Sequence, residues 1–314
     1  MNNKDKHNNH VLPKLYLKGF VIKKDEPFIW VYQRGQPYNP GGEQYNHRDK
    51  ITHNPYNDTI RNAGALIDFY ADPKKDGTKD YETFENKLEL LEKPHDPIFK
   101  KLRAHQVITH EEKCRFSSYI VLMHRRVPAG RRTIKELVSK KGLYEPTKEL
   151  LQKLNQRFNL QDTPELRAAI RQKVESKAQD EDYHIQGHNR ITAASPDSLL
   201  IEKLQKMTWT FYIAPGADIF LTGDNPVFIP DAYGIAGDKR FSELSFPIST
   251  DVALVASWNR ALKNGFVEAT PQMIKDINRR TVSKSSQYIY FSKNAEWVVN
   301  LLKKNPYEYH PICK

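Results

Sequence analysis

The spacing of apolar residues changes twice along the chain and divides it into three parts. The first part holds one clear strand, Phe28–Gln33, within PFIWVYQRG, where a Gly turn ends the run. From residue 81 the spacing becomes three and four, as in Phe84, Leu88 and Leu91, which predicts a helix over 81–93. The last third returns to short β-rich runs separated by Pro, Gly and Asp. The pattern therefore predicts strands at both ends and helices between them.

The middle part reads as a succession of helices. Residues 111–126 form a run whose second half is more apolar, and Pro128 and Gly130 are predicted to interrupt it, so that the next helix starts near Arg132. Further helices are expected over 146–178, with Thr163-Pro164 at a helix start, and over 196–206. Residues 10–20 are expected to form a short helix or an extended entry segment.

The β-rich runs of the last third lie within 207–257, and QYIYFS at 287–292 adds a strand between two helices. The predicted fold class is α+β, with a mixed, largely antiparallel sheet built from both ends of the chain and a helical middle section. We expect a disordered tail at 1–9, a single domain over 10–305 and a tail at 306–314. Within the domain, a helical subdomain would span about 81–206, and the sheet would come from 28–33 and 207–292.

The composition of the chain indicates the cellular compartment in which we expect the protein. The 314 residues contain no apolar run of about 18 residues, and the polar start MNNKDKHNNH has no apolar segment of a secretory signal. The two cysteines, Cys114 and Cys313, are far apart in sequence and predict neither a disulfide framework nor a zinc site. We therefore expect a protein without a membrane span, in a reducing cytoplasm.

The formal net charge of +11 favours polyanionic partners. Residues 99–142 hold 12 Lys or Arg and 3 Glu, a local net charge of +9. The same segment could equally be a solvated helical surface. Within it, HRRVPAGRR places Arg125, Arg126, Arg131 and Arg132 around a Pro-Gly break, and the planar guanidinium suits phosphate. These arginines are candidate substrate-binding residues for a nucleic acid or another phosphate-bearing ligand.

The stretch HVLPKLYLKGF raises a separate question. Read as a helix, His10, Pro13, Tyr16, Leu17 and Phe20 share one face. Packing explains the last three residues of that set, and it does not explain the histidine and the proline.

A second unusual stretch is FLTGDNPVF, residues 220–228, in which apolar residues lead into and out of a polar turn. Asp224 and Asn225 suit such a turn because their side chains bond nearby backbone N–H groups. The alternative is a functional carboxylate and amide held at a strand end.

Four glutamates, Glu82, Glu85, Glu89 and Glu92, form a stripe on the predicted helix 81–93. Such a stripe is usually a solvated face. If Glu85 and Glu92 lie at the edge of the buried face, they need cations, and Arg126 or a divalent metal would serve. His184 and His188 lie four residues apart, but Gly187 between them weakens a zinc site. The chain has no Walker A, G-x-G-x-x-G, G-x-S-x-G or H-E-x-x-H motif.

These stretches, taken in order, resemble a bacterial family described as domain of unknown function 4238, and the resemblance runs over nearly the whole chain. The matching positions are His10, Pro13, Tyr16, Leu17, Phe20, DFY at 68–70, Glu85, Glu92, Arg126, Pro128, Thr222, Asp224, Asn225, Pro226, FPIS at 246–249 and Asn278. Ile248 departs from the family's Leu, and residues 130–195 carry no family landmark. The resemblance implies a bacterial protein with a suspected role in phage or mobile-element conflict, and it implies no reaction.

We hypothesise that His10, Glu85, Arg126, Asp224, Asn225 and Asn278 converge on one cleft between the helices and the sheet. In a nuclease-like phosphodiesterase acting on RNA or DNA, His10 would be the general acid or base, with Asp224 and Asn225 orienting it or binding Mg²⁺ with Glu85.

The other substrate-binding candidates are Tyr16 and Asn278. The alternatives are a non-catalytic module that binds nucleic acid, a nucleotide or a protein, and a hydrolase or transferase for a small anionic substrate. The cofactor and the oligomeric state stay open.

Overall fold

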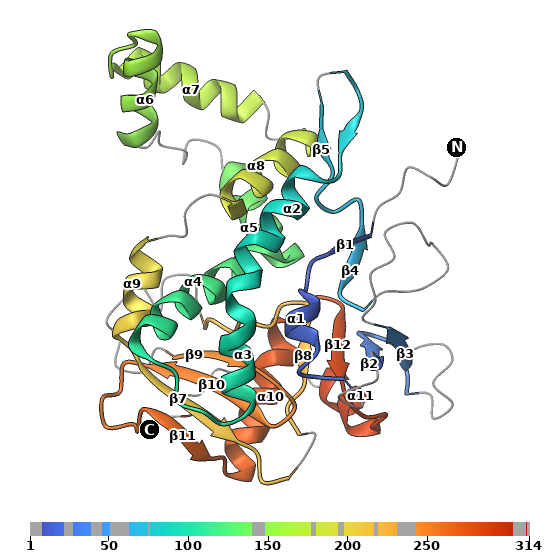
Figure 1. Ribbon diagram of the computed structural model, residues 1–314. Coiled ribbons are helices and arrows are strands. Elements are labelled where there is room, and N and C mark those ends of the chain that lie inside the picture. Colours follow the sequence, from blue (N-terminus) through green and yellow to red (C-terminus); the bar gives the residue numbers. More distant parts are fainter. Residues whose placement is uncertain are drawn as a thin grey trace.

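The computed structural model describes residues 8–21, 28–38, 46–50, 63–74, 76–139, 148–176, 180–193, 198–216, 219–230, 243–303 and 312 (Figure 1). Most of the two predicted tails, 1–9 and 306–314, lies outside these residues. The strands are β1 (Asn8–His10), β2 (Phe28–Gln33), β3 (Asn46–Lys50), β4 (Ala65–Ile67), β5 (Asp72–Pro73), β6 (Lys79–Asp80), β7 (Thr208–Ile213), β8 (Thr222–Gly223), β9 (Glu243–Pro247), β10 (Val252–Ser257), β11 (Gly265–Glu268) and β12 (Tyr288–Phe291).

The helices follow the predicted division of the chain. They are α1 (Lys14–Leu17), α2 (Thr83–Glu92), a 3-10 turn (Lys93–His95), α3 (Asp96–Arg103), α4 (His110–Arg126), α5 (Pro128–Ser139), α6 (Lys148–Phe158), α7 (Pro164–Ser176), α8 (Glu181–Ala193), α9 (Ser198–Lys206), α10 (Pro271–Lys284) and α11 (Glu296–Lys303). In Figure 1, α2, α4, α5 and α8 gather above the sheets, and α6 and α7 project from them.

Two four-stranded sheets form the lower part of the molecule. The first has the order β11-β7-β10-β9, in which β10 is antiparallel to both neighbours and β11 is parallel to β7. Every residue of β10 is buried, as the unbroken apolar run VALVAS requires of a strand covered on both faces. The second sheet has the order β3-β2-β12-β8 and is antiparallel.

The second sheet joins the two ends of the chain. Strand β2, from the first part, pairs with β12, and Trp30 lies opposite Phe291. The expected α+β class, with antiparallel pairing between chain ends and a helical middle, is confirmed. The described strands of 207–292 divide between two sheets, and the described residues 219–230 contribute β8 and a bridge between Phe228 and Ser245.

An aromatic core connects the helices to the first sheet. The ring of Tyr16 in α1 stacks on Phe246 in β9, with 5.1 Å between ring centroids, and contacts the edge of Phe99 in α3. Phe99 in turn packs against Phe116 and Tyr119 of α4. All five side chains are fully buried, so this core fixes α1, α3 and α4 against the sheet.

One local expectation was wrong, and another is made more specific by the structure. Helix α5 begins at Pro128 rather than near Arg132, because a proline at the first helical position gives up an N–H that would have no helical partner anyway. Only Val127 separates α4 from α5. The helical part of 10–20 is restricted to α1, which begins after Pro13, so His10 lies in β1 and not on the same helical face as Tyr16.

None of the helices in the described part of the chain combines the length and apolar character needed to cross a membrane.

A buried ion pair fastens α10 to the first sheet. Arg280 donates to Glu243 at 2.7 Å, both side chains are fully buried, and Glu243 also accepts the backbone N–H of Ile312 at 2.9 Å. We predict that Arg280→Ala lowers the free energy of unfolding by about 3–5 kcal/mol, because it breaks a buried ion pair by removing one of its two partners. Urea denaturation measures this loss. Lys206→Ala, which removes an exposed pair with Glu202, is the control and should leave the midpoint unchanged. An equal midpoint for both variants would contradict the prediction.

Candidate functional site

A cavity of about 350 Å³ opens where β1 and α1 meet α2 and the end of α4. Its walls are His10, Pro13, Lys14, Leu15, Glu85, Asn86, Leu88, Glu89, Glu92 and Arg126. Three of these, His10, Glu85 and Arg126, are residues that the sequence singled out from three distant stretches. The structure therefore brings part of the predicted set to one place.

Arg126 forms the back of this cavity. Its side chain is only 2% exposed, and its Nη1 donates to Glu92 Oε1 in an ion pair. Its Nη2 donates to the backbone oxygen of His10 at 2.5 Å. The carbonyl of Arg126 accepts the hydroxyl of Tyr70 at 2.8 Å. The pairing of Glu92 with Arg126, one of the two partners considered for that glutamate, is thus confirmed.

Local sequence places the other wall residues. Strand β1 pairs with β4, so that His10 lies opposite Ala65, and the side-chain oxygen of Asn9 accepts the N–H of Tyr70 at 2.8 Å. Pro13 precedes α1, and its extended backbone turns the chain from β1 into the helix that carries Lys14. The steps of four and three from Glu85 to Glu89 and Glu92 keep the three carboxylates on one face of α2.

The cavity holds charges of both signs. Burial lowers the pKa of Lys14, and the carboxylates of Glu85 and Glu89 oppose that shift. Burial raises the pKa of Glu92, and the guanidinium of Arg126 opposes it. With the Arg126–Glu92 pair neutral, the remaining wall presents an ammonium, an imidazole and two carboxylates. Such a set can bind a polar molecule and move protons to and from it.

Asp224 lies in a different network. Its carboxylate accepts the backbone N–H groups of Ser286, Gln287 and Tyr288 at 2.6, 2.7 and 3.1 Å. Burial raises the pKa of Asp224, and these three donors oppose the shift. The carboxylate thereby ties the TGDNP turn to the start of β12.

Tyr16, Asn225 and Asn278 anchor the same segment. The hydroxyls of Tyr16 and Thr222 lie 2.6 Å apart, and the amide of Asn225 donates to the carbonyl of Lys284 at 3.3 Å. The side chain of Asn278 accepts the N–H of Leu221 at 3.2 Å and donates to the carbonyl of Ile219 at 3.0 Å. The expected single cleft is thus two assemblies, with His10, Glu85 and Arg126 at the cavity and these residues along 219–225.

The remaining arginine candidates also have partners within the fold. Arg131 lies over the ring of Phe69 at 3.6 Å and donates to its carbonyl, and Arg132 donates to the hydroxyl of Ser286. Arg125 lines a separate cavity of about 70 Å³, beside Tyr119 and Thr192.

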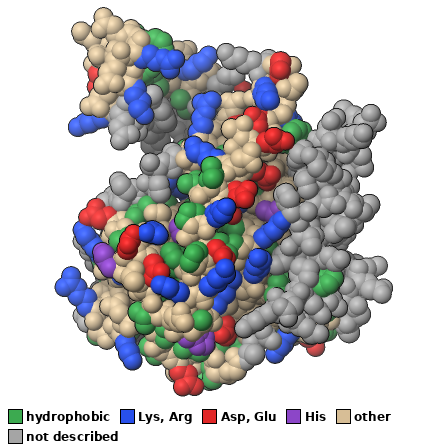
Figure 2. All heavy atoms as spheres, in the orientation of Figure 1, with side chains coloured by type: hydrophobic (Ala, Val, Ile, Leu, Met, Phe, Trp, Pro, Cys, Tyr) green, Lys and Arg blue, Asp and Glu red, His purple; other side chains and the backbone are tan. Residues whose placement is uncertain are grey.

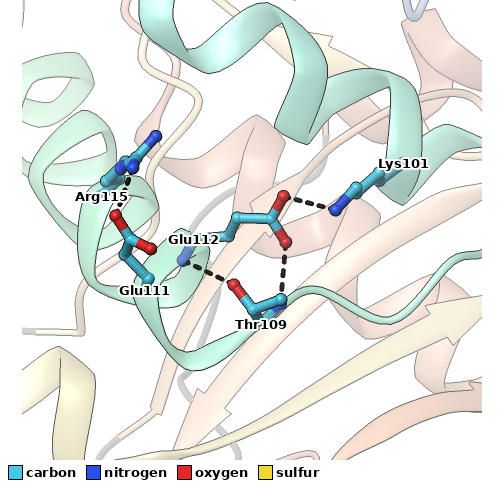
Figure 3. Close-up of polar contacts among 5 residues, drawn as sticks. All are labelled: Lys101, Thr109, Glu111, Glu112 and Arg115. Atoms are coloured by element: carbon cyan, nitrogen blue, oxygen red, sulfur yellow. Dashed lines mark hydrogen bonds and ion pairs between the residues drawn. The ribbon is translucent and has the colours of Figure 1, made fainter.

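The rest of the basic segment 99–142 is similarly occupied. Figure 3 shows Lys101 bonded to Glu112, which caps α4 with Thr109, and Arg115 bonded to Glu111. Lys100 pairs with Asp96, Lys113 donates to the carbonyl of Met207, and the half-buried Arg103 donates to the carbonyls of Leu15 and Tyr16. Positive and negative side chains are interspersed on the face in Figure 2. Over 99–139, the part of this segment that the structure describes, these cations therefore do not form an open cationic track.

Sequence reasoning missed Lys14 and the polar face of α8. That face buries His184, His188, Asn189 and Thr192, and the amide of Asn189 donates to the carbonyl of Tyr70 at 3.0 Å. The spacing of four residues between the two histidines was the available signal in the sequence, although this spacing does not identify the side chains or carbonyls that they contact. Among the described residues, no three His, Cys, Asp or Glu side chains are grouped so that they could hold a metal ion.

The Asp224 network gives a stability prediction. Asp224→Ala leaves three backbone N–H groups without their acceptor, so we expect the free energy of unfolding to fall by at least about 2 kcal/mol. Chemical denaturation measures it. Asn225→Ala, which removes a single long hydrogen bond from the next residue, is the matched control and should cost clearly less. Equal losses in the two variants would be inconsistent with the triple acceptor role.

Two histidines predict acid sensitivity. The pKa values of His124 and His188 are lowered from 6.5 to about 4, mainly by burial and then by cations, Lys284 for His124 and Arg131 for His188. In the unfolded chain these two imidazoles bind protons near pH 6.5, whereas in the folded chain they stay neutral down to about pH 4. The free energy of unfolding therefore falls as the pH drops from 6.5 to about 4. Each histidine contributes up to about 1.36 kcal/mol per pH unit.

Urea denaturation across this pH range measures that slope. His188→Gln, which cannot titrate there, should flatten it, and an unchanged slope would contradict the prediction.

Comparison with known proteins places the chain in a family. The family model described as protein of unknown function (DUF4238) matches residues 8–295. No curated protein and no solved structure matches the chain.

Proposed function

We propose that the chain, which belongs to this family of proteins of unknown function, is an enzyme that hydrolyses or transfers a group on a small polar substrate. The observation that carries the proposal is the cavity where His10, Glu85 and Arg126 meet. Its volume of about 350 Å³ falls in the range of small-molecule sites, about 300–1,000 Å³. Four separate elements, β1, α1, α2 and α4, supply its polar groups, as is common for sites that orient a substrate.

The wall residues have distinct roles in this proposal. His10 acts as general acid or base, because an imidazole changes protonation near neutral pH. Lys14 binds an anionic group of the substrate, and Glu85 and Glu89 accept hydrogen bonds from its hydroxyl or amino groups. Arg126 and Glu92 are positioning residues, since Arg126 holds the backbone of His10 through its Nη2.

The charge pattern favours a small substrate over a polymer. Among the described residues, Lys14 is the one Lys or Arg that lines the cavity besides the paired Arg126, and the carboxylates of Glu85 and Glu89 act on its ammonium group. A uniformly anionic strand meets repulsion from these carboxylates, whereas a small molecule with an anionic group next to a hydrogen-bond donor fits both signs.

A nuclease-like phosphodiesterase, with a place in phage or mobile-element defence, is the second candidate. The observation that favours it is the formal net charge of +11 for the whole chain, which attracts RNA and DNA. In that reading His10 is again the acid or base, and a divalent metal would have to be brought with the substrate.

A two-step experiment tests the proposal. The protein is first screened by thermal shift against phosphorylated, carboxylated and zwitterionic metabolites, and the compounds that raise its melting temperature are then assayed for turnover by mass spectrometry. We expect His10→Ala to lower kcat/KM by about 10²–10⁴ while the melt stays cooperative, because acid–base catalysis supplies about that factor. Glu85→Gln should raise KM more than it lowers kcat.

Lys87→Ala serves as the control, because Lys87 is exposed on the same helix and does not line the cavity. The same three variants are incubated with RNA and single-stranded DNA, with Mg²⁺ and with chelator. Polymer cleavage that is lost in His10→Ala would replace the proposal with the nuclease. Turnover that survives in both His10→Ala and Glu85→Gln would place the reaction elsewhere.

A further inference from the structure

A second groove, separate from the cavity of His10, lies between α10 and α11, and its lining includes Asn278. Its volume is about 360 Å³, and its walls include Ile274, Lys275, Arg279, Trp297, Asn300 and Leu301. The chain passes from α10 through β12 before it returns as α11, and Val282 of α10 and Val298 of α11 belong to one apolar cluster with Ile289 of β12.

The floor of the groove is apolar and its most prominent side chain is an indole. Trp297 is 42% exposed, although tryptophan is among the side chains with the most apolar area to bury. The edge contact with Phe291, 5.3 Å between ring centroids at 75°, holds the ring from one side. Ile274 and Leu301 complete an apolar surface beside it. An ordered, exposed aromatic plane of this kind suits a flat ligand.

The rim of the groove is positively charged. Lys275 and Arg279 are one helical turn apart, so they project on the same side of α10. Asp276 is the ion-pair partner of Arg279 in the described part of the chain, and its oxygen lies 4.0 Å from Nη1, at the limit of such a contact. No carboxylate occurs among the described lining residues. This contrasts with the first cavity, where Glu85 and Glu89 offset Lys14.

We infer that this groove binds a nucleotide. The base stacks on Trp297, the phosphate lies between Lys275 and Arg279, and the side-chain amide of Asn300 bonds the edge of the base. An aromatic platform beside cations is the arrangement by which proteins hold bases of single strands without a strict sequence code. The groove volume fits one nucleotide unit among small-molecule sites of about 300–1,000 Å³.

The inference accounts for the charge that the basic segment 99–142 does not explain. The net charge of +11 attracts polyanions, while four cations of that segment, Lys100, Lys101, Arg115 and Arg126, are paired with carboxylates within the fold. Lys275 and Arg279 keep their charge at the surface. The ligand chemistry, a base with a phosphate, is common to a free nucleotide and to a single strand, and the experiment separates these two sources.

The test uses the full chain and two probes, adenosine monophosphate and a fluorescein-labelled 12-residue single-stranded DNA. Isothermal titration calorimetry, which does not depend on the substituted tryptophan, reports binding of the first probe, and fluorescence anisotropy reports binding of the second. Trp297→Ala should weaken binding of whichever probe binds by at least about fivefold, the equivalent of losing one stacked base, and Trp297→Phe should restore much of it. Lys275→Ala should lower the slope of log affinity against log salt by about one for the strand.

Controls separate stacking and specific charge from general effects. Phe158→Ala removes another exposed aromatic side chain, and Lys263→Ala removes an exposed cation that lines neither cavity. Each should bind like the wild type. Binding of the nucleotide alone assigns a small-molecule site, and tighter binding of the strand assigns a single-strand site. Binding of neither probe, or binding that is equal in Trp297→Ala and wild type with both cooperatively folded, would overturn the inference.

Discussion

The buried pairing of Arg126 with Glu92 is the interaction on which the candidate site depends. A guanidinium that is 2% exposed loses its water, and a carboxylate beside it loses most of its own. The two groups offset this cost only when they stay together and their other hydrogen-bonding atoms find partners. Here Nη2 of Arg126 donates a hydrogen bond to the backbone carbonyl of His10. One side chain at the end of α4 thereby fixes α2 and β1, the two elements that face each other across the cavity.

The same principle explains where the basic residues of the chain go. A high local positive charge reads, in the sequence, as a surface for polyanions. In the folded protein Arg103 and Arg131 are used to satisfy backbone carbonyls, and Lys101 joins the cap of α4. These long side chains connect segments far apart in sequence, such as α3 with α1. Charge counted along the chain is therefore a poor guide to charge at the surface, and the unpaired cations have to be found in the fold.

Much of the architecture follows from local pattern. The apolar period of Phe84 and Leu88 predicts α2 closely, and the run at 28–33 predicts β2 to the residue. Pairing between strands could not be read in this way, because a short strand such as β8 is defined by its neighbours rather than by its own residues. The start of α5 at Pro128 was missed because a proline both ends one helix and begins another. For the site, the sequence indicated polar residues beside apolar runs, but it could not tell Glu85, which lines a cavity, from Asp224, which holds backbone N–H groups.

The two cavities differ in charge, and this difference underlies the two separate proposals, a reaction site at the first cavity and a nucleotide groove at the second. A double-mutant cycle tests most directly whether the Arg126–Glu92 pair holds the proposed reaction site together. The cycle compares Arg126→Met, Glu92→Gln and the double variant, and it measures the free energy of unfolding in urea. We expect each single variant to lose about 3–5 kcal/mol and the double variant to lose at least about 1 kcal/mol less than the sum, because removing both charges leaves none buried alone. If the loss in the double variant equals the sum of the two single losses within about 0.5 kcal/mol, the two side chains are not coupled, and the pair does not hold the cavity together.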